Sequence, residues 1–181
     1  MKGGNGPLWR YAKGNWKKLS SPNPQFGFGA FAISKSNPQV IVAAVPISPQ
    51  AATIGVFKSD DGGAKWGRLP ALDTLMVGGS PPRFASWAAH GPSGIAAFEG
   101  YWQPSLLAFD PADENTIVAG AMDAGVFLSR DGGRTWTVVT DNSSNTSPII
   151  PRPILAAFAH HGASTTIYVG TQGRGVWRIR Y

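Results

Sequence analysis

The sequence lacks cysteine and is poor in charge, and these absences exclude several classes of protein. Its 181 residues contain no cysteine, and 14% of them are charged. Disulfide scaffolds, thiolate metal centres and cysteine nucleophiles are therefore excluded. No stretch approaches the ~18 consecutive apolar residues of a membrane-spanning helix, and residues 1–11 lack the apolar segment of a signal peptide. We expect one domain and no membrane association.

Acidic residues are absent from the first third of the chain, where no acid precedes Asp60. Five cations fall within the first 18 residues, and the formal net charge of the chain is +6. This segment could meet a polyanion. The remaining cations, however, are scattered singly along predicted strands, which is typical of a solvated surface rather than of a phosphate-binding track. Nucleic-acid binding is therefore disfavoured.

Glycine, proline and short β-branched runs are abundant. The 23 glycines and 15 prolines disfavour long helices and favour short strands joined by turns. Runs rich in β-branched residues occur at 40–43, 116–120 and 166–170, and each follows a turn-forming segment. These features predict an all-β protein.

An internal repeat specifies the architecture further. Residues 55–66 (GVFKSDDGGAKW) align without gaps on residues 125–136 (GVFLSRDGGRTW), and residues 175–177 (GVW) repeat the opening. With the upstream runs, each unit is a strand, turn, strand, loop, strand, tight hairpin and strand. Four short antiparallel strands in ~40 to 50 residues are characteristic of a β-propeller blade. The 50 residues between Gly125 and Gly175 fit this spacing.

The repeats predict a single propeller segment over 1–181 that does not form a complete ring. Its expected parts are a partial blade at 8–20, a blade at 26–70, an inserted loop at 71–103, a blade at 104–140 and a partial final blade at 152–181. Propellers have ~4 to 8 blades. Three arrangements remain open: further blades in a longer polypeptide, closure of the ring by self-association, or an N-terminal hairpin that joins the last blade. We favour the first, with self-association as the alternative.

The tight hairpin carries the pattern Ser-x-Asp-x-Gly-x-Thr-Trp. This pattern resembles the Asp box of the bacterial neuraminidase (BNR) repeat, which occurs in sialidases, xyloglucan-degrading propeller hydrolases and sortilin-type receptors. The matching residues are Ser129, Asp131, Gly133, Thr135 and Trp136 in one copy and Ser59, Asp61, Gly63 and Trp66 in the other, where Lys65 replaces Thr. Such an Asp accepts hydrogen bonds from turn amides, Gly supplies positive φ, and Trp packs beneath the hairpin. The boxes are therefore expected to be structural.

Asp123 is the candidate catalytic residue. Xyloglucanase-type hydrolases carry each catalytic Asp in a Thr-Asp-x-Gly-Gly-aromatic hairpin, and the similar segment 120–127 implies an acid or base role for Asp123. Inverting hydrolysis requires two carboxylates ~6.5 to 9.5 Å apart. The aligned positions in the other copies are Gly173 and the segment 53–54, which cannot titrate. We therefore expect this chain to lack a complete glycosidase site of its own.

The inserted loop contains candidate substrate-binding residues. Aromatic rings stack on sugar faces and carboxylates bind hydroxyls, which makes Trp87, Glu99, Tyr101 and Trp102 candidates. The alternative is that these rings anchor a long loop onto the propeller. No His or acidic cluster has metal-ligand spacing, so we expect no metal and no cofactor.

Taken together, the resemblance implies a carbohydrate-binding or carbohydrate-processing protein with a polysaccharide or other glycan as its partner. Any enzyme activity would be that of a xyloglucanase-like glycoside hydrolase, and the full-length protein would act outside the cytoplasm. The alternative is a non-catalytic scaffold whose blades display loops to a protein partner. A glycan site would expose Trp87, Tyr101 or Trp102 beside Asp123, whereas a scaffold would bury those rings.

Overall fold

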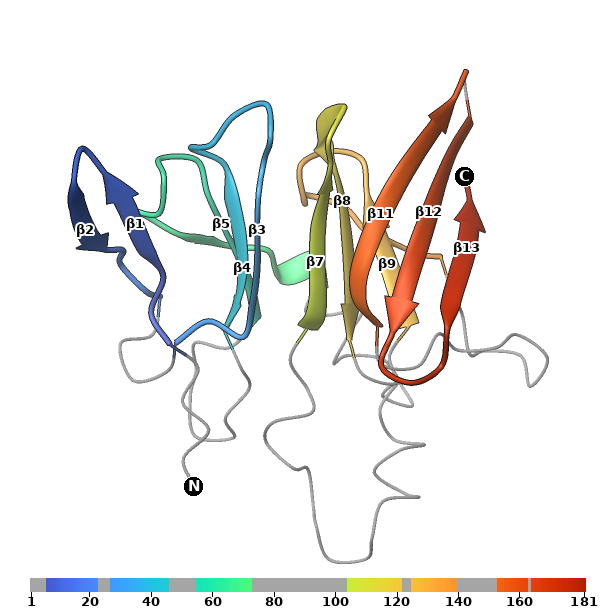
Figure 1. Cartoon of the computed structure of the whole chain (residues 1–181), viewed down its shortest axis with the longest axis horizontal. Helices are drawn as coiled ribbons and strands as arrows, with labels where there is room; N and C mark the ends of the chain where they lie inside the picture. Colours follow the sequence, from blue (N-terminus) through green and yellow to red (C-terminus); the bar gives the residue numbers. More distant parts are fainter. Residues whose placement is uncertain are drawn as a thin grey trace, which may run out of the picture.

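The protein is built almost entirely from antiparallel strands (Figure 1). The computed structural model describes residues 6–22, 27–45, 55–72, 104–121, 125–139, 153–162 and 164–181. Within these ranges, a helical turn at 70–72 is the one departure from strands, turns and irregular segments. The prediction of an all-β protein is confirmed. No helix in these ranges is long and apolar enough to cross a membrane.

The strands within the described ranges form four separate sheets, in which chain neighbours pair antiparallel. The N-terminal hairpin consists of β1 (Trp9–Ala12) and β2 (Asn15–Lys18). The first blade consists of β3 (Ala30–Ile33), β4 (Ile41–Val45), β5 (Gly55–Ser59) and β6 (Gly67–Arg68). The second blade consists of β7 (Pro104–Asp110), β8 (Asp113–Ala121), β9 (Gly125–Ser129) and β10 (Thr137–Val138). The third blade consists of β11 (Pro153–His161), β12 (Ser164–Thr171) and β13 (Val176–Arg180).

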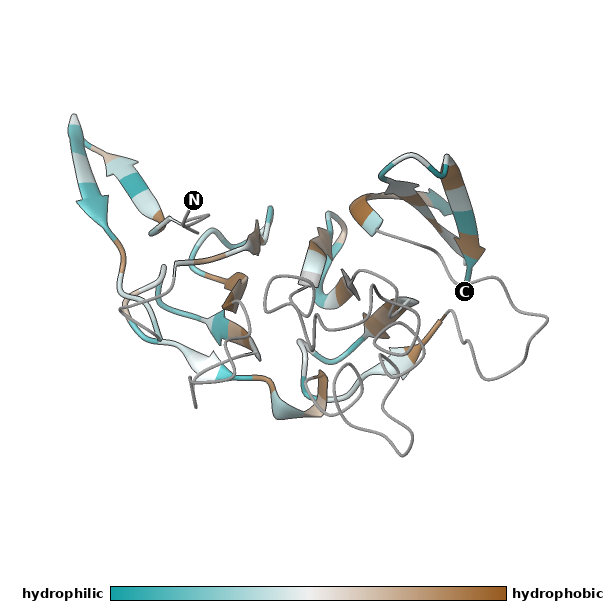
Figure 2. Ribbon diagram, turned by 90° about the horizontal axis from the view of Figure 1, so that it is seen from below, coloured by the Kyte–Doolittle hydropathy of each residue, from teal (hydrophilic) through white to brown (hydrophobic). Residues whose placement is uncertain are grey.

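The blades stack side by side through their first strands. Strand β7 contacts β3 on one side and β11 on the other (Figure 1). Figure 2 shows hydrophobic residues on the strands of the blades, whereas the N-terminal hairpin is mainly hydrophilic. This stacking of four-stranded antiparallel units is the arrangement of consecutive blades in a β-propeller. In the part of the chain that the structure describes, two complete blades, a three-stranded blade and a hairpin make an incomplete propeller, as the repeats predict.

The central strands of the first and second blades are buried on both faces, and this explains their continuous apolar runs. All five residues of β4 are buried. Because side chains alternate along a strand, Val42 and Ala44 point into the cluster between the first and second blades, whereas Ala43 and Val45 point into the cluster beneath the N-terminal hairpin. The first blade therefore contributes one face to each of two hydrophobic clusters, as the second blade does. The third blade contributes one face, to the cluster that it shares with the second blade.

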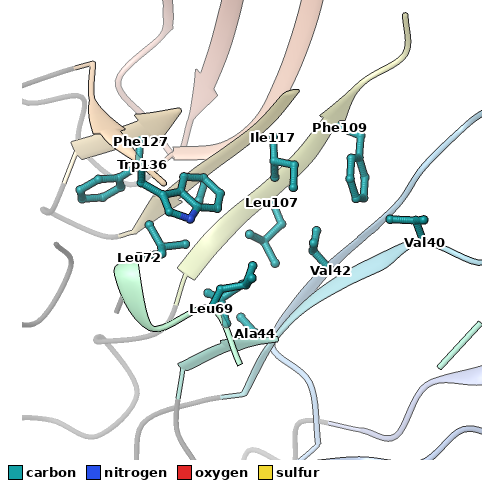
Figure 3. Packing of buried hydrophobic residues seen from close by; sticks show 12 residues of the cluster. Val40, Val42, Ala44, Leu69, Leu72, Leu107, Phe109, Ile117, Phe127 and Trp136 are labelled. Atoms are coloured by element: carbon teal, nitrogen blue, oxygen red, sulfur yellow. The ribbon is translucent and has the colours of Figure 1, made fainter. Parts of the chain in front are cut away.

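Two larger clusters join the three blades. Figure 3 shows the first, in which side chains of the first blade meet side chains of the second; its members include Val40, Val42, Leu69, Leu72, Leu107, Phe109, Ile117, Phe127 and Trp136. The second cluster lies between the second and third blades and contains Leu106, Val118, Val126, Leu128, Ile167 and Val169. Interdigitation of these side chains fixes the position of each blade on its neighbour.

The three blades share one strand register. Between the second and third strands of each blade, Val42 pairs with Lys58, Val118 with Leu128, and Tyr168 with Arg178. Two residues further along, Ala44 pairs with Val56, Gly120 with Val126, and Gly170 with Val176. Structurally equivalent positions can therefore be compared from blade to blade.

Candidate functional site

The two ends of each blade carry different sets of predicted residues. At one end, Val45 pairs with Gly55 and Ala121 pairs with Gly125, and we call this the connection end. At the opposite end, Ser59 pairs with Ile41 and Ser129 pairs with Ile117, and the Ser-x-Asp turns follow these serines. We call this the box end; it is uppermost in Figure 1. Asp61 and Asp131 therefore lie at the end of the blades opposite to the paired residues Ala121 and Gly125.

The predicted catalytic and substrate-binding residues lie outside the described residues. These residues are Asp123, Trp87, Glu99, Tyr101 and Trp102. For Asp123, the structure describes the flanking strands β8 and β9. These strands meet at the connection end, where Ala121 pairs with Gly125. The assignment of these five residues to a site stays a prediction.

The turn of the second blade is organised around the carboxylate of Asp131. Its Oδ1 accepts hydrogen bonds from Ser129 Oγ (2.9 Å) and from the amide of Thr135 (2.9 Å). Its Oδ2 accepts a bond of 2.6 Å from Thr135 Oγ1. The hydroxyl and the amide of Thr135, followed by Ser129, stabilise the ionised form and lower the pKa of Asp131 to about 2. A carboxylate held ionised in this way is poorly suited to donate a proton at neutral pH.

The turn of the first blade repeats this geometry on one carboxylate oxygen. Asp61 Oδ1 accepts hydrogen bonds from Ser59 Oγ (2.8 Å) and from the amides of Ala64 (2.9 Å) and Lys65 (2.8 Å). The Lys65 amide is the largest cause of the lowered pKa of Asp61. Lys65 occupies the position of Thr135 in the second blade. Because lysine has no hydroxyl, it cannot make a counterpart of the bond from Thr135 Oγ1 to Asp131 Oδ2.

Glycine and tryptophan complete the two turns. The four glycines of these two turns adopt positive φ: Gly62 (69°), Gly63 (86°), Gly132 (71°) and Gly133 (94°). The buried indole of Trp136 donates a hydrogen bond to the Gly133 carbonyl (2.9 Å) within its own turn. The half-buried Trp66 instead donates to the Ser20 carbonyl (3.0 Å), in the segment that follows the N-terminal hairpin. Trp66 therefore also ties the hairpin to the first blade.

A second cluster of polar side chains lies at the box end, between the second and third blades. Asp110, at the end of β7, is buried, and its Oδ1 lies 2.9 Å from Nε2 of His160 in β11. The same oxygen accepts the Ala112 amide (2.8 Å), and His160 Nδ1 lies 3.2 Å from Thr165 Oγ1. The histidine therefore bridges two blades with both ring nitrogens engaged.

Tyr181 belongs to the same region. The guanidinium of Arg130 lies 4.4 Å from the centre of the Tyr181 ring. Burial raises the pKa of the Tyr181 phenol, and the negative charge of Asp110 adds to this, whereas a hydrogen bond with Thr165 and the charge of Arg130 act in the opposite direction.

The sequence alone does not pair Asp110 with His160. Asp110 accepts the amide of Ala112 two residues on, which is typical of an Asp in a turn. The missing signal was spatial, because the two residues are 50 positions apart in neighbouring blades. The register brings them near each other: Phe109 pairs with Ile117 and Phe158 with Ile167, and Asp110 lies one residue beyond Phe109 whereas His160 lies two residues beyond Phe158.

Two charged clefts lie beside the box turns. A cleft of about 740 Å³ separates the turns of the first and second blades, and its charged rim includes Lys58, Lys65, Arg68, Arg134, Asp61 and Asp131. A cleft of about 420 Å³ lies between the N-terminal hairpin and the first blade, and Arg10, Lys17, Lys18 and Asp61 contribute to it. No group of three or more potential metal-ligating residues occurs in the described part of the chain.

Comparisons with known proteins identify the fold. No protein-family model matches the chain, and no curated protein matches it either. Among solved structures, an ancestral GH74 enzyme has a TM-score of 0.53 and 19% identity over 91% of this chain and 18% of that chain. The GH74 xyloglucanase from Xanthomonas campestris has a TM-score of 0.48 and 24% identity over 92% of this chain and 23% of that chain. The Niastella koreensis GH74 enzyme has a TM-score of 0.49 and 18% identity over 84% of this chain and 21% of that chain.

The chain spans about a fifth of the length of these enzymes. The similarity to the ancestral GH74 enzyme is a similarity of fold. It confirms, at that level, the predicted resemblance to propellers of the xyloglucanase type.

Proposed function

We propose that this chain contributes a polysaccharide-binding surface of a β-propeller, formed at the connection end of the blades. The observation that carries the proposal is the strand register, which fixes the box turns at one end and the strands flanking Asp123 at the other. The fold similarity to a GH74 enzyme supports the choice of ligand class. Xyloglucan is the first candidate ligand, and a polysaccharide of this kind would place the full-length protein outside the cytoplasm.

The state of the box carboxylates supports this division of roles. Asp61 and Asp131 accept several hydrogen bonds each and have lowered pKa values, so they stabilise turns as anions at neutral pH. Neither of these two carboxylates is therefore suited to exchange a proton near neutral pH. Carbohydrate contacts are therefore assigned to the connection end. There Trp87, Glu99, Tyr101 and Trp102 would bind the sugar, with Asp123 beside them.

Hydrolysis is assigned to a larger assembly rather than to this chain alone. A glycosidase of this class needs a second carboxylate beside Asp123. In the third blade the equivalent connection contains Gly173 and Gly175, both at positive φ, neither of which carries a titratable side chain. The second carboxylate would come from outside this segment, with Asp123 as the single acid or base that this segment supplies.

The proposal is tested by calorimetric titration of the chain with xyloglucan oligosaccharides and, for comparison, cello-oligosaccharides. We expect binding that weakens about tenfold in Trp87→Ala or Trp102→Ala, because a stacked ring contributes on the order of 1 kcal/mol or more. Asp131→Asn, at the box end, is the matched control and should bind as the wild type does. Absence of binding to every oligosaccharide, by a chain with native circular dichroism, would refute the proposal.

The alternative function is a non-catalytic scaffold for protein partners. Exposed aromatic side chains on the N-terminal hairpin favour it, since Trp9, Tyr11 and Trp16 are all exposed, and the rings of Tyr11 and Trp16 lie 5.1 Å apart. Aromatic residues are enriched in protein interfaces. If the chain is a scaffold, the calorimetric titration should detect no oligosaccharide binding, and Trp16→Ala should weaken the binding of the chain to its protein partner.

A further inference from the structure

The third blade exposes a face whose equivalents in the other blades are buried. Val176 is 72% exposed, although Val56 and Val126, which occupy the same register position, are 1% and 0% exposed. In the first strands, Leu155 is 54% exposed, and its counterpart Leu106 is 2% exposed. Val56, Val126 and Leu106 are covered by the following blade. The exposed face of the third blade is thus a blade-stacking surface.

The interface between the first and second blades reveals what such a surface contacts at the box end. Lys58 and Leu69 of the first blade lie against the turn glycines of the second: a Cβ built on Gly132 would be 3.3 Å from Lys58 Nζ, and one on Gly133 would be 2.8 Å from Leu69 Cδ1. The following blade must therefore carry small residues at these two turn positions.

The N-terminal hairpin makes the same contacts with the first blade. A Cβ built on Gly62 would be 3.1 Å from Arg10 Nη1, and one on Gly63 would be 2.7 Å from Leu19 Cδ1. The hairpin is in register with the outer strands of a blade, because Leu19 donates its amide to the Leu8 carbonyl as Leu69 does to the Val56 carbonyl. The same contact therefore occurs twice: a cation and a leucine of one unit lie against the two turn glycines of the next.

Charge completes the pattern. Arg10 lines one cleft together with Asp61, and Lys58 lines the other together with Asp131. In both cases a cation of one unit lines the same cleft as the ionised carboxylate in the turn of the next, and Lys58 also forms an ion pair of 3.1 Å with Asp60 of its own blade. Arg178 is the third-blade equivalent of Lys58, since it pairs with Tyr168 as Lys58 pairs with Val42. Arg178 is exposed.

We propose that the outward face of the third blade, formed by Leu155, Tyr168, Val176 and Arg178, binds a further β-blade that carries a Ser-x-Asp-x-Gly-Gly turn of the box type. The apolar side chains would pack on the inner strands of that blade, and Arg178 would face its turn aspartate. This inference rests on the stacking of the blades and not on polysaccharide binding, so the two proposals can fail separately.

A second copy of this chain fits the surface less well. The N-terminal hairpin that such a copy could present has a short turn at Lys13 and Gly14 in place of a box, with Lys17 and Lys18 in the following strand. Its cations would face Arg178, and like charges across an interface are unfavourable. The occupant is therefore a blade with an acidic turn.

The test extends the full chain with the surface that is expected to fit. Residues 27–181 are fused after Tyr181 through a flexible Gly/Ser linker, so that the first blade with its box turn is offered to the third. A fusion of residues 1–181, in which the N-terminal hairpin covers that blade, is the matched control. Amide hydrogen exchange of β12 and β13 should slow by about tenfold or more in the first fusion only.

Variants make the outcome specific. Arg178→Glu and Val176→Asp in the first fusion should abolish the protection, whereas Val176→Asp in the unextended chain should leave its melting temperature unchanged, because this side chain is exposed. Unchanged exchange in the first fusion would overturn the proposal. A dimer of the unextended chain in light scattering that Val176→Asp dissociates would also overturn it, because the face would then belong to a second copy.

Discussion

His160 in the third blade lies with its Nε2 2.9 Å from Oδ1 of Asp110 in the second blade, and the Asp110 side chain is 4% exposed. Replacing His160 with Ala would leave this buried carboxylate with the Ala112 amide as its remaining described donor. We expect His160→Ala to lower the free energy of unfolding by about 1 to 2 kcal/mol. Urea denaturation would measure it, with the exposed His161→Ala as the control. Equal effects of the two substitutions would contradict the prediction.

Asp131→Ala should destabilise the second blade. The substitution removes the acceptor of bonds from Ser129 and from both donors of Thr135. Because the turn lies at the surface, where water replaces part of the loss, we expect a decrease of about 1 to 2 kcal/mol. Thermal unfolding would measure it, and Asp60→Ala serves as the control because Asp60 forms a solvent-exposed ion pair with Lys58. An unchanged melting temperature would contradict a structural role for this box.

Stability should fall in acid partly through Asp131. Its pKa is about 2 in the folded state, against an ordinary value of 3.8. A depressed folded pKa contributes stability that is fully present above the ordinary value and is lost as the pH falls through the folded value. We expect the loss between about pH 5 and pH 2. Asp131→Asn should flatten the dependence of the free energy of unfolding on pH in this window; a profile as steep as that of the wild type would contradict the assignment.

Gly133→Ala should cost more than a glycine substitution at a similar φ in open space. Gly133 has φ 94°, and a Cβ there would lie 2.8 Å from Leu69 Cδ1. Gly173 has φ 78° and no atom within 4 Å of such a Cβ. Backbone strain affects both positions, so we expect about 1 kcal/mol for Gly173→Ala and about 2 to 4 kcal/mol for Gly133→Ala. Chemical denaturation of the pair isolates the contact between blades, and equal costs would contradict it.

The fold was accessible from sequence because the repeats record local geometry. The double glycines at 62–63 and 132–133 mark positions of positive φ, and the runs at 40–43 and 116–120 mark strands buried on both faces. Contacts between blades were not accessible in this way. The bond from Trp66 to the Ser20 carbonyl spans 46 residues and depends on how the hairpin sits on the first blade. The residues proposed to bind a glycan are identified by residue type and by the family resemblance alone, because they lie outside the described residues.

The second blade has a special place in this molecule, because β7 is in contact with both β3 and β11. In a stack of repeats, stability is approximately a sum of the units and of the interfaces between neighbours. Unfolding can therefore begin at either end and stop at a blade boundary. Opening of the third blade would leave the first two joined through Leu69 and Phe127. Opening of the second blade would break its interfaces with both the first and the third blade at once. The cooperativity of unfolding in this chain therefore depends on the second blade.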